Sequence, residues 1–114
     1  MTRHDDKVRL RHMLDHAQEA VSMVEGKTQA DLVDNRVLQF ALTRVVEIVG
    51  EAATRVSPET QQQLKRIPWP QVIALRNRLA HGYEAVDLYI LWEIVEMDMP
   101  ALIRALQEAL ALDQ

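Results

Sequence analysis

The sequence has no cysteine, three glycines and a single phenylalanine among its 114 residues. Without cysteine, the chain can form neither a disulfide nor a thiolate metal site. So few glycines leave little room for tight turns, and the scarcity of aromatic residues disfavours a β-sandwich core. The chain also has no run of 18 apolar residues, and its first residues, MTRHDDKVRLRH, are charged throughout. Both features argue against a membrane span and a secretory signal, so we expect a cytoplasmic protein.

What the sequence does contain is typical of one globular domain that covers residues 1–114. Hydrophobic residues make up 48% of the chain and charged residues 26%, which is the composition of an ordinary folded protein. The formal net charge is −4 at pH 7. Broad electrostatic binding to nucleic acid normally needs a basic surface, so we expect no binding to DNA. A small local basic site remains compatible with this charge.

Apolar residues recur at spacings of three and four along most of the chain. This spacing predicts an all-α fold, an antiparallel bundle of four to five helices. The expected order is a helix over 5–25 ended by Gly26, a link over 27–33, a helix over 35–56 capped by Asp34, a short helix after Ser57-Pro58, and a helix from Pro70 to about Gly82.

A last helix is expected from a cap at Asp87 nearly to the C-terminus, with a kink at Pro100, because proline removes one amide donor. One apolar stripe along it predicts the core face: Leu88, Trp92, Val95, Met99, Leu102, Leu106 and Leu110. A second stripe contains Ile90, Ile94, Met97 and Ala101. A helix that is apolar on two sides is usually covered on both, so the second stripe predicts a homodimer interface. The alternative is a thicker core within one protomer.

The segment with the most chemistry is Arg76-Asn77-Arg78-Leu79-Ala80-His81-Gly82-Tyr83. It places a permanent cation, a titratable imidazole and a phenol within eight residues. An imidazole can take or give the proton of an RNA 2′-hydroxyl, and a guanidinium can stabilise charge on the phosphate oxygens. Two copies in a dimer would supply both an acid and a base. From the composition and spacing alone, a solvated helix end is the favoured interpretation.

The wider pattern resembles HepT-like proteins of the HEPN superfamily. The segment from Arg76 reads Arg-Asn-x-x-x-His-x-Tyr, and Ile48-Val49-Gly50-Glu51-Ala52-Ala53 resembles the second helix of that family. Further similarities follow in the same order at Ile67-Pro68-Trp69-Pro70, at Val86-Asp87-Leu88, at Leu91-Trp92 and at Pro100.

This resemblance implies a helical homodimer that cleaves RNA without a metal or cofactor, as the toxin of a toxin–antitoxin pair. Arg76 and His81 would be its catalytic residues, with Asn77 as a polar support. It also implies a nucleotidyltransferase antitoxin that neutralises the toxin by adding AMP to Tyr83. The alternative is a helical docking module that binds such a nucleotidyltransferase and has little activity of its own.

Two residues of the second predicted helix have more than one interpretation. Glu51 is either a carboxylate that orients Arg76, in its own protomer or in a dimer mate, or an ordinary surface residue. Gly50 costs about 1 kcal/mol against alanine inside a helix, so it indicates a close helix approach or is simply tolerated. His12 and His16 are spaced like metal ligands, but they lie opposite the apolar stripe and are better interpreted as a solvated face.

Overall fold

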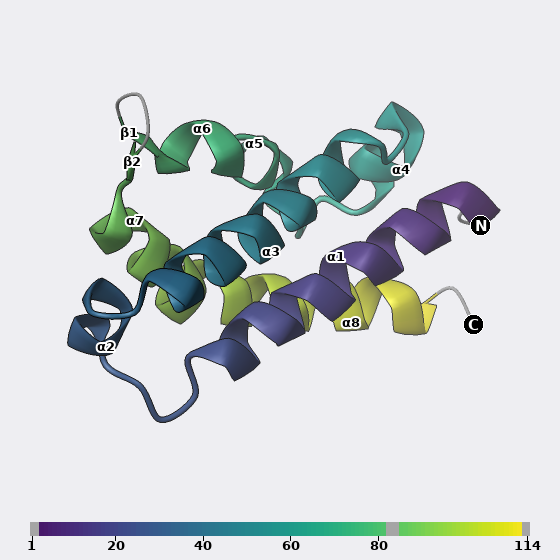
Figure 1. The fold of residues 1–114 in the computed structure, drawn as a ribbon. Helices are drawn as coiled ribbons and strands as arrows, with labels where there is room; N and C mark the ends of the chain where they lie inside the picture. The colour runs from purple at the N-terminus through teal and green to yellow at the C-terminus, as the bar shows by residue number, and fades with distance from the viewer. Residues whose placement is uncertain (1–2, 82–84, 113–114) are drawn as a thin grey trace.

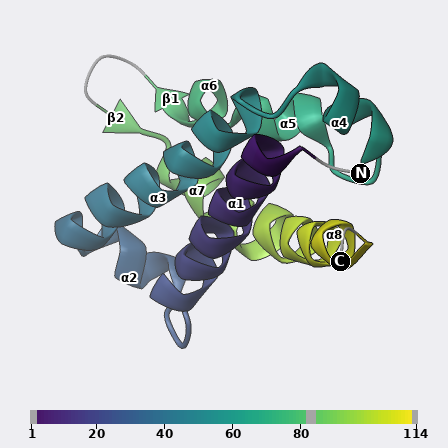
Figure 2. The same ribbon diagram turned by 90° about the vertical axis from the view of Figure 1, so that its right-hand side faces the viewer.

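The computed structural model describes residues 3–81 and 85–112, with the side chains of 81 and 85 left out of the description. Three long helices form its frame: α1 (His4–Met23), α3 (Arg36–Thr54) and α8 (Met99–Leu112). Figure 1 shows α1 between the other two and running opposite to both. Figure 2 shows α3 and α8 on two different sides of α1. The predicted antiparallel all-α bundle is therefore confirmed.

Shorter elements connect these helices. They are α2 (Gln29–Val33), α4 (Pro58–Gln63), α5 (Trp69–Ile73), α6 (Leu75–Leu79), β1 (Ala80–His81), β2 (Ala85–Val86), α7 (Leu88–Glu93) and the π-helix η1 (Ile94–Asp98). The described part of the chain thus contains more helices than the four to five expected, because several of them are short. No helix in the described part of the chain is long and apolar enough to cross a membrane.

The core is aliphatic and lies where the three long helices meet. Its largest fully buried side chains include Leu10, Met13, Leu42, Val46, Leu91, Met99 and Leu106. The core stripe predicted for the last helix is confirmed from Val95 onward, and its first two members are partly buried.

The segment predicted as a link over 27–33 instead contains the helix α2. The Thr28 side chain accepts a hydrogen bond from the Asp31 amide, and the Asp31 carboxylate accepts one from the Thr28 amide. This capping box stabilises a helix that is too short to show apolar periodicity. The N-cap of the next helix is Asn35 rather than Asp34, because Asp34 already ends α2.

The helix predicted from Pro70 to about Gly82 is confirmed as two short helices, α5 and α6, and is wrong after Leu79. The chain leaves the helical conformation at Ala74, resumes it in α6, and ends it at Leu79. The backbone then becomes extended, and β1 pairs antiparallel with β2, with His81 opposite Ala85. The Asp87 amide donates to the Leu79 carbonyl at 3.2 Å, which closes the base of this pair. Strand pairing therefore replaces the last helical turn.

In place of the kink expected at Pro100, the structure has the π-helix η1 just before it, and Pro100 lies in the first turn of α8. Proline has no amide to donate to the turn before it, and a π-helix satisfies backbone groups with wider i→i+5 bonds. The wider turn changes which side chains share a face. Ile94 is fully buried in its own protomer, Ile90 is half-buried, and Met97 is 68% exposed. The predicted dimer stripe is therefore wrong for Ile94.

Gly50 marks the closest approach between α3 and α5. A Cβ atom at this position would lie 3.1 Å from the Val72 carbonyl oxygen and 3.5 Å from the Cβ of Leu75. The interpretation of Gly50 as a close helix approach is confirmed. The absence of a side chain there lets α5 and α6 sit directly on α3, which fixes the position of the motif that follows.

The N-terminus of α1 is tied to the start of α4 through a buried carboxylate. Asp6 is 3% exposed and accepts hydrogen bonds from the Ser57 amide, the Ser57 hydroxyl and the Thr60 hydroxyl. Ser57 also caps α4, as predicted, because its Oγ accepts from the Thr60 amide. Burial, the largest single effect, raises the pKa of Asp6, but the hydrogen bonds together outweigh it and hold the pKa below its usual value.

Candidate functional site

The motif segment begins on α6, which carries two arginines with different surroundings. The side chains of Arg76 and its neighbour Asn77 are exposed, and neither side chain forms a hydrogen bond or ion pair with the residues that the structure describes. Arg78 is half-buried, and its Nη1 donates to the Asp98 carboxylate at 2.6 Å. Arg76 is thus a cation open to an incoming anion, whereas Arg78 is already neutralised within the protein.

His81 follows directly after α6, in the two-residue strand β1. The backbone of His81 is opposite Ala85, and the placement of its side chain is outside the description. Tyr83 lies outside the described residues. Figure 1 places β1 and β2 at the end of the molecule that is farthest from the two termini. Arg76 therefore lies in the helix α6, and His81 lies in the strand that directly follows this helix.

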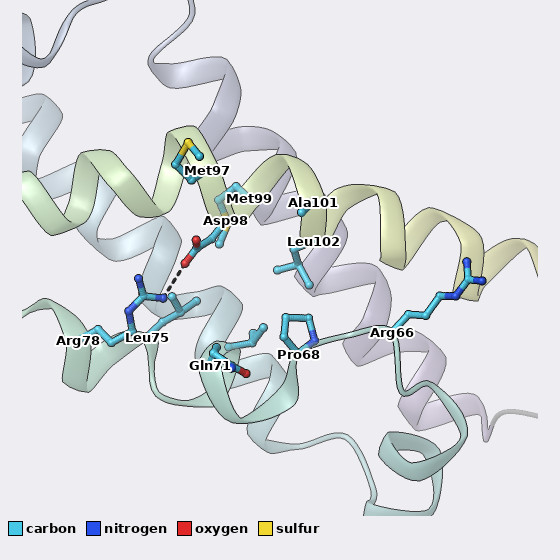
Figure 3. A pocket seen from close by; sticks show the side chains of 11 residues that line it. Arg66, Pro68, Gln71, Leu75, Arg78, Met97, Asp98, Met99, Ala101 and Leu102 are labelled. Carbon is cyan, nitrogen blue, oxygen red and sulfur yellow. Dashed lines mark hydrogen bonds and ion pairs between the residues drawn. The ribbon is translucent and has the colours of Figure 1, made fainter.

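An apolar groove runs beneath α6, between α5 and the η1–α8 segment, and has a volume of about 270 Å³. Figure 3 shows Leu75, Pro68 and Leu102 along it, with Met97 at one side. The Arg78–Asp98 ion pair crosses one end of the groove. Both partners are about a third exposed, at 31% and 38%, so the pair stabilises the fold by no more than about 1 kcal/mol. Its main effect is to hold α6 against η1.

Glu51 lies on α3, one residue beyond the Gly50 contact, but its partner is not Arg76. The Arg44 guanidinium donates to Glu51 Oε2 at 2.7 Å and also lies 3.8 Å from Glu47. Within one protomer, the prediction that Glu51 orients Arg76 is therefore wrong, because Arg44 holds the carboxylate. The prediction of a role toward a dimer mate stays a prediction.

The sequence analysis did not identify Arg44 as part of the candidate site. The signal was available, since Arg44, Glu47 and Glu51 recur at spacings of three and four on α3, which places them on one helix face. A second unpredicted contact lies nearby, where the Arg36 guanidinium stands 4.7 Å from the centre of the Phe40 ring. Both arginines lie on the outer surface of α3, on the side that borders β2.

Comparison with known proteins places the motif in a family. The model of a family described as ribonuclease HepT-like matches residues 13–109. The chain belongs to this family. The match extends from α1 to α8, so it covers the Gly50 contact, α6 and β1 together. The resemblance inferred from the motif residues is confirmed.

Relatives of this HepT-like chain have names that describe ribonucleases. A "Probable ribonuclease HepT" of Thermococcus cleftensis is 32% identical over 93 residues, which cover 78% of this chain and 84% of the relative. A "Putative RNase" of Caldanaerobacter subterraneus is 31% identical and covers 89% of this chain and 90% of the relative. A "Putative RNase" of Methanocaldococcus jannaschii is 29% identical, over 88% of this chain and 92% of the relative. No solved structure gave a significant match.

Proposed function

We propose that this HepT-like protein is a metal-independent endoribonuclease, the toxin of a toxin–antitoxin pair, with Arg76 and His81 as its catalytic residues. The observation that carries the proposal is the exposed guanidinium of Arg76 on α6, which has no partner among the described residues, in a ribonuclease-family chain whose next strand contains His81. Asn77 is exposed beside Arg76 and would serve as a polar support.

The proposed reaction is an internal transesterification of RNA. The His81 imidazole removes the proton of a 2′-hydroxyl, whose oxygen attacks the adjacent phosphorus and forms a cyclic phosphate. The bond from phosphorus to the 5′-oxygen breaks, and that oxygen takes a proton from an imidazolium. The Arg76 guanidinium stabilises the charge that builds on the phosphate oxygens.

A homodimer would supply the second imidazole, so that one histidine acts as base and the other as acid. Of the stripe first proposed as its interface, Met97 and Ala101 remain exposed and Ile90 is half-buried. Met97 and Ala101 also border the apolar groove beneath α6. A second copy that binds to this groove would therefore come close to α6 of the first copy. Glu51 could contact the dimer mate only if its ion pair with Arg44 broke.

The proposed antitoxin is a nucleotidyltransferase that transfers AMP from ATP to the phenol oxygen of Tyr83, with release of pyrophosphate. The added phosphodiester brings bulk and negative charge next to Arg76 and His81 in the sequence, and negative charge repels RNA phosphates. After incubation with the partner and ATP, intact-mass analysis is expected to show one added AMP, mapped to Tyr83. An unchanged mass, or AMP mapped to another residue, would contradict this part of the proposal.

The decisive experiment measures cleavage of RNA by the purified chain in EDTA. His81→Ala and Arg76→Ala are each expected to reduce cleavage by at least about a hundredfold, with the helical circular dichroism spectrum unchanged. His16→Ala is the matched control, because the His16 ring bonds only to its own helix, through the His12 carbonyl. Cleavage that needs a divalent metal, or that survives His81→Ala, would refute the proposed mechanism.

A growth assay tests the toxin role. We expect growth arrest when the chain is expressed without the antitoxin gene, and normal growth when the two genes are expressed together.

The alternative function is a docking module for the nucleotidyltransferase with little activity of its own. The observation that favours it is the net charge of −4, which is unfavourable for RNA binding. This alternative predicts a stable complex with the nucleotidyltransferase and no RNA cleavage at any enzyme concentration.

A further inference from the structure

The outer surface of α3 is bordered by three hollows that share arginines. The first lies between α3 and the segment that begins at β2, and Phe40, Arg44 and Val86 line it. The second lies between α3 and α1, and it shares Arg44 with the first and contains Arg9 and Arg55. The third shares Arg9 and Arg55 with the second and extends to the start of α1. Because each hollow shares residues with the next, they form one continuous surface, which we call the α3 track.

Cations outnumber carboxylates along this track, although the whole chain is acidic. Its lining contains five arginines, Arg3, Arg9, Arg36, Arg44 and Arg55, against four carboxylates, Asp5, Asp6, Glu47 and Glu51. One carboxylate, Asp6, is buried and turned into bonds with Ser57 and Thr60. Two more, Glu47 and Glu51, are held by Arg44.

Arg9 and Arg55 are two cations of the track that have no counter-ion among the described residues. Neither forms a hydrogen bond or ion pair through its side chain with any residue in the described part of the chain. Both line the second and the third hollow, so two like charges face the same space. Like charges that share a site repel each other, and an anion placed between them relieves that repulsion. The second hollow, whose one carboxylate is the Arg44-bound Glu51, is therefore complementary to a phosphate group.

The track also carries an aromatic ring at the end nearest β2. Phe40 is 61% exposed, and the Arg36 guanidinium lies 4.7 Å from its ring centre. Exposed aromatic rings in a basic groove are typical of surfaces that bind single-stranded nucleic acid, because bases stack on the ring while cations follow the backbone. From Arg36 to Arg55 the helix extends for about 28 Å at 1.5 Å per residue, which is enough for a strand of several nucleotides.

We propose that the α3 track binds the phosphate backbone of single-stranded RNA and leads the strand to the β1–β2 pair. Arg9 and Arg55 hold phosphates, and Phe40 stacks on a base close to β2. The assignment rests on the proposed function, because it takes RNA to be the substrate. It gives an acidic protein a local basic route by which RNA reaches Arg76 and His81.

The test measures the affinity of the full-length protein for a fluorescein-labelled single-stranded oligoribonucleotide by anisotropy, over a series of salt concentrations. His81→Ala is present in every sample to prevent cleavage. The test variant is Arg9→Gln with Arg55→Gln, and the control is Lys65→Gln with Arg104→Gln, which removes the same charge from exposed positions outside the track.

The test variant is expected to bind more weakly, and the slope of log K against log salt is expected to fall by about 1.4, since each lost phosphate contact accounts for about 0.7 with single strands. The control is expected to keep the parent slope. Phe40→Ala is expected to weaken binding about 5- to 100-fold, and Phe40→Tyr to restore it. Equal affinities and slopes for test and control variants would overturn the proposal.

Two further outcomes separate the possible failures. If Phe40→Ala changes the molar mass in light scattering while RNA affinity stays the same, the track is an interface between copies of the chain and the proposal is wrong. If the chain with His81 intact does not cleave RNA, but the track variants lose binding, the proposed enzyme function fails and the RNA surface stands.

Discussion

Removal of the Asp6 carboxylate is expected to destabilise the whole bundle, because this group joins the start of α1 to the start of α4. It accepts three hydrogen bonds, at 3.0 Å from the Ser57 amide and at 2.6 Å from each of the Ser57 and Thr60 hydroxyls. Hydrogen bonds to a charged group contribute about 1.5–3 kcal/mol each. The contributions are not additive, since the two hydroxyls lie 3.2 Å apart and can bond to each other once Asp6 is absent.

For Asp6→Ala we therefore expect a loss of about 3 kcal/mol in the free energy of unfolding at pH 7. That is a large part of the 5–15 kcal/mol that is typical of a domain, and it corresponds to a fall in Tm of about 10 °C or more. Urea unfolding followed by circular dichroism measures the difference directly. Asp5→Ala is the matched control, because Asp5 is exposed on the first turn of the same helix.

The difference between the parent protein and Asp6→Ala should also depend on pH. The pKa of Asp6 is lower in the folded protein than its usual value, so the charged form stabilises the fold above the unfolded pKa of about 4. This contribution is lost as the pH falls through the folded pKa. We expect the difference to be constant near neutral pH and to shrink below about pH 4. An unchanged stability at pH 7, or a difference that does not shrink in acid, would refute this reasoning.

Three further predictions concern the motif helix and its neighbours. Gly50→Val is expected to cost about 1–3 kcal/mol and to lower RNA cleavage, because the new Cβ would press on the Val72 carbonyl at 3.1 Å; urea unfolding and a cleavage assay check both. A double-mutant cycle on Arg78→Gln and Asp98→Asn is expected to give a coupling free energy of at most about 1 kcal/mol in urea unfolding, since the pair is partly exposed. A larger value would show that the ion pair contributes more to stability than a surface pair does. Asn35→Ala is expected to lower the free energy of unfolding by about 1 kcal/mol, because its side chain accepts from an amide of the first turn of α3; no change in urea unfolding would argue against this cap.

The frame of the fold could be predicted from the sequence because it depends on long, regular patterns. The apolar periodicity of α1 and α3 extends over many turns, and the caps Ser57 and Asp87 use a local side chain whose bond needs no distant partner. The close contact at Gly50 was also predictable, since glycine inside a helix is unfavourable unless the missing side chain matters.

The details around the site depend on contacts that no local pattern shows. The helix α6 ends at Leu79 because residues after it pair with β2, and four paired residues are too few for a periodic signal. Glu51 takes Arg44 as its partner because the two lie on the same face of α3, whereas one of its two predicted interpretations paired it with Arg76. The burial of Ile94 follows from the π-helix, which depends on packing as well as on the sequence before Pro100.

The π-helix has a consequence for how this protein tolerates changes in length. A single π turn acts as one residue inserted into an α-helix, so a deletion within Ile94–Asp98 would leave an ordinary helix with α7 and α8 in their present orientations. A deletion in α8 before Leu102 would instead rotate all later side chains by about 100° and turn Leu102 and Leu106 out of the core. Gains and losses of single residues can thus alter the rim of the groove, where Met97 and Asp98 lie, while the interior packing stays the same.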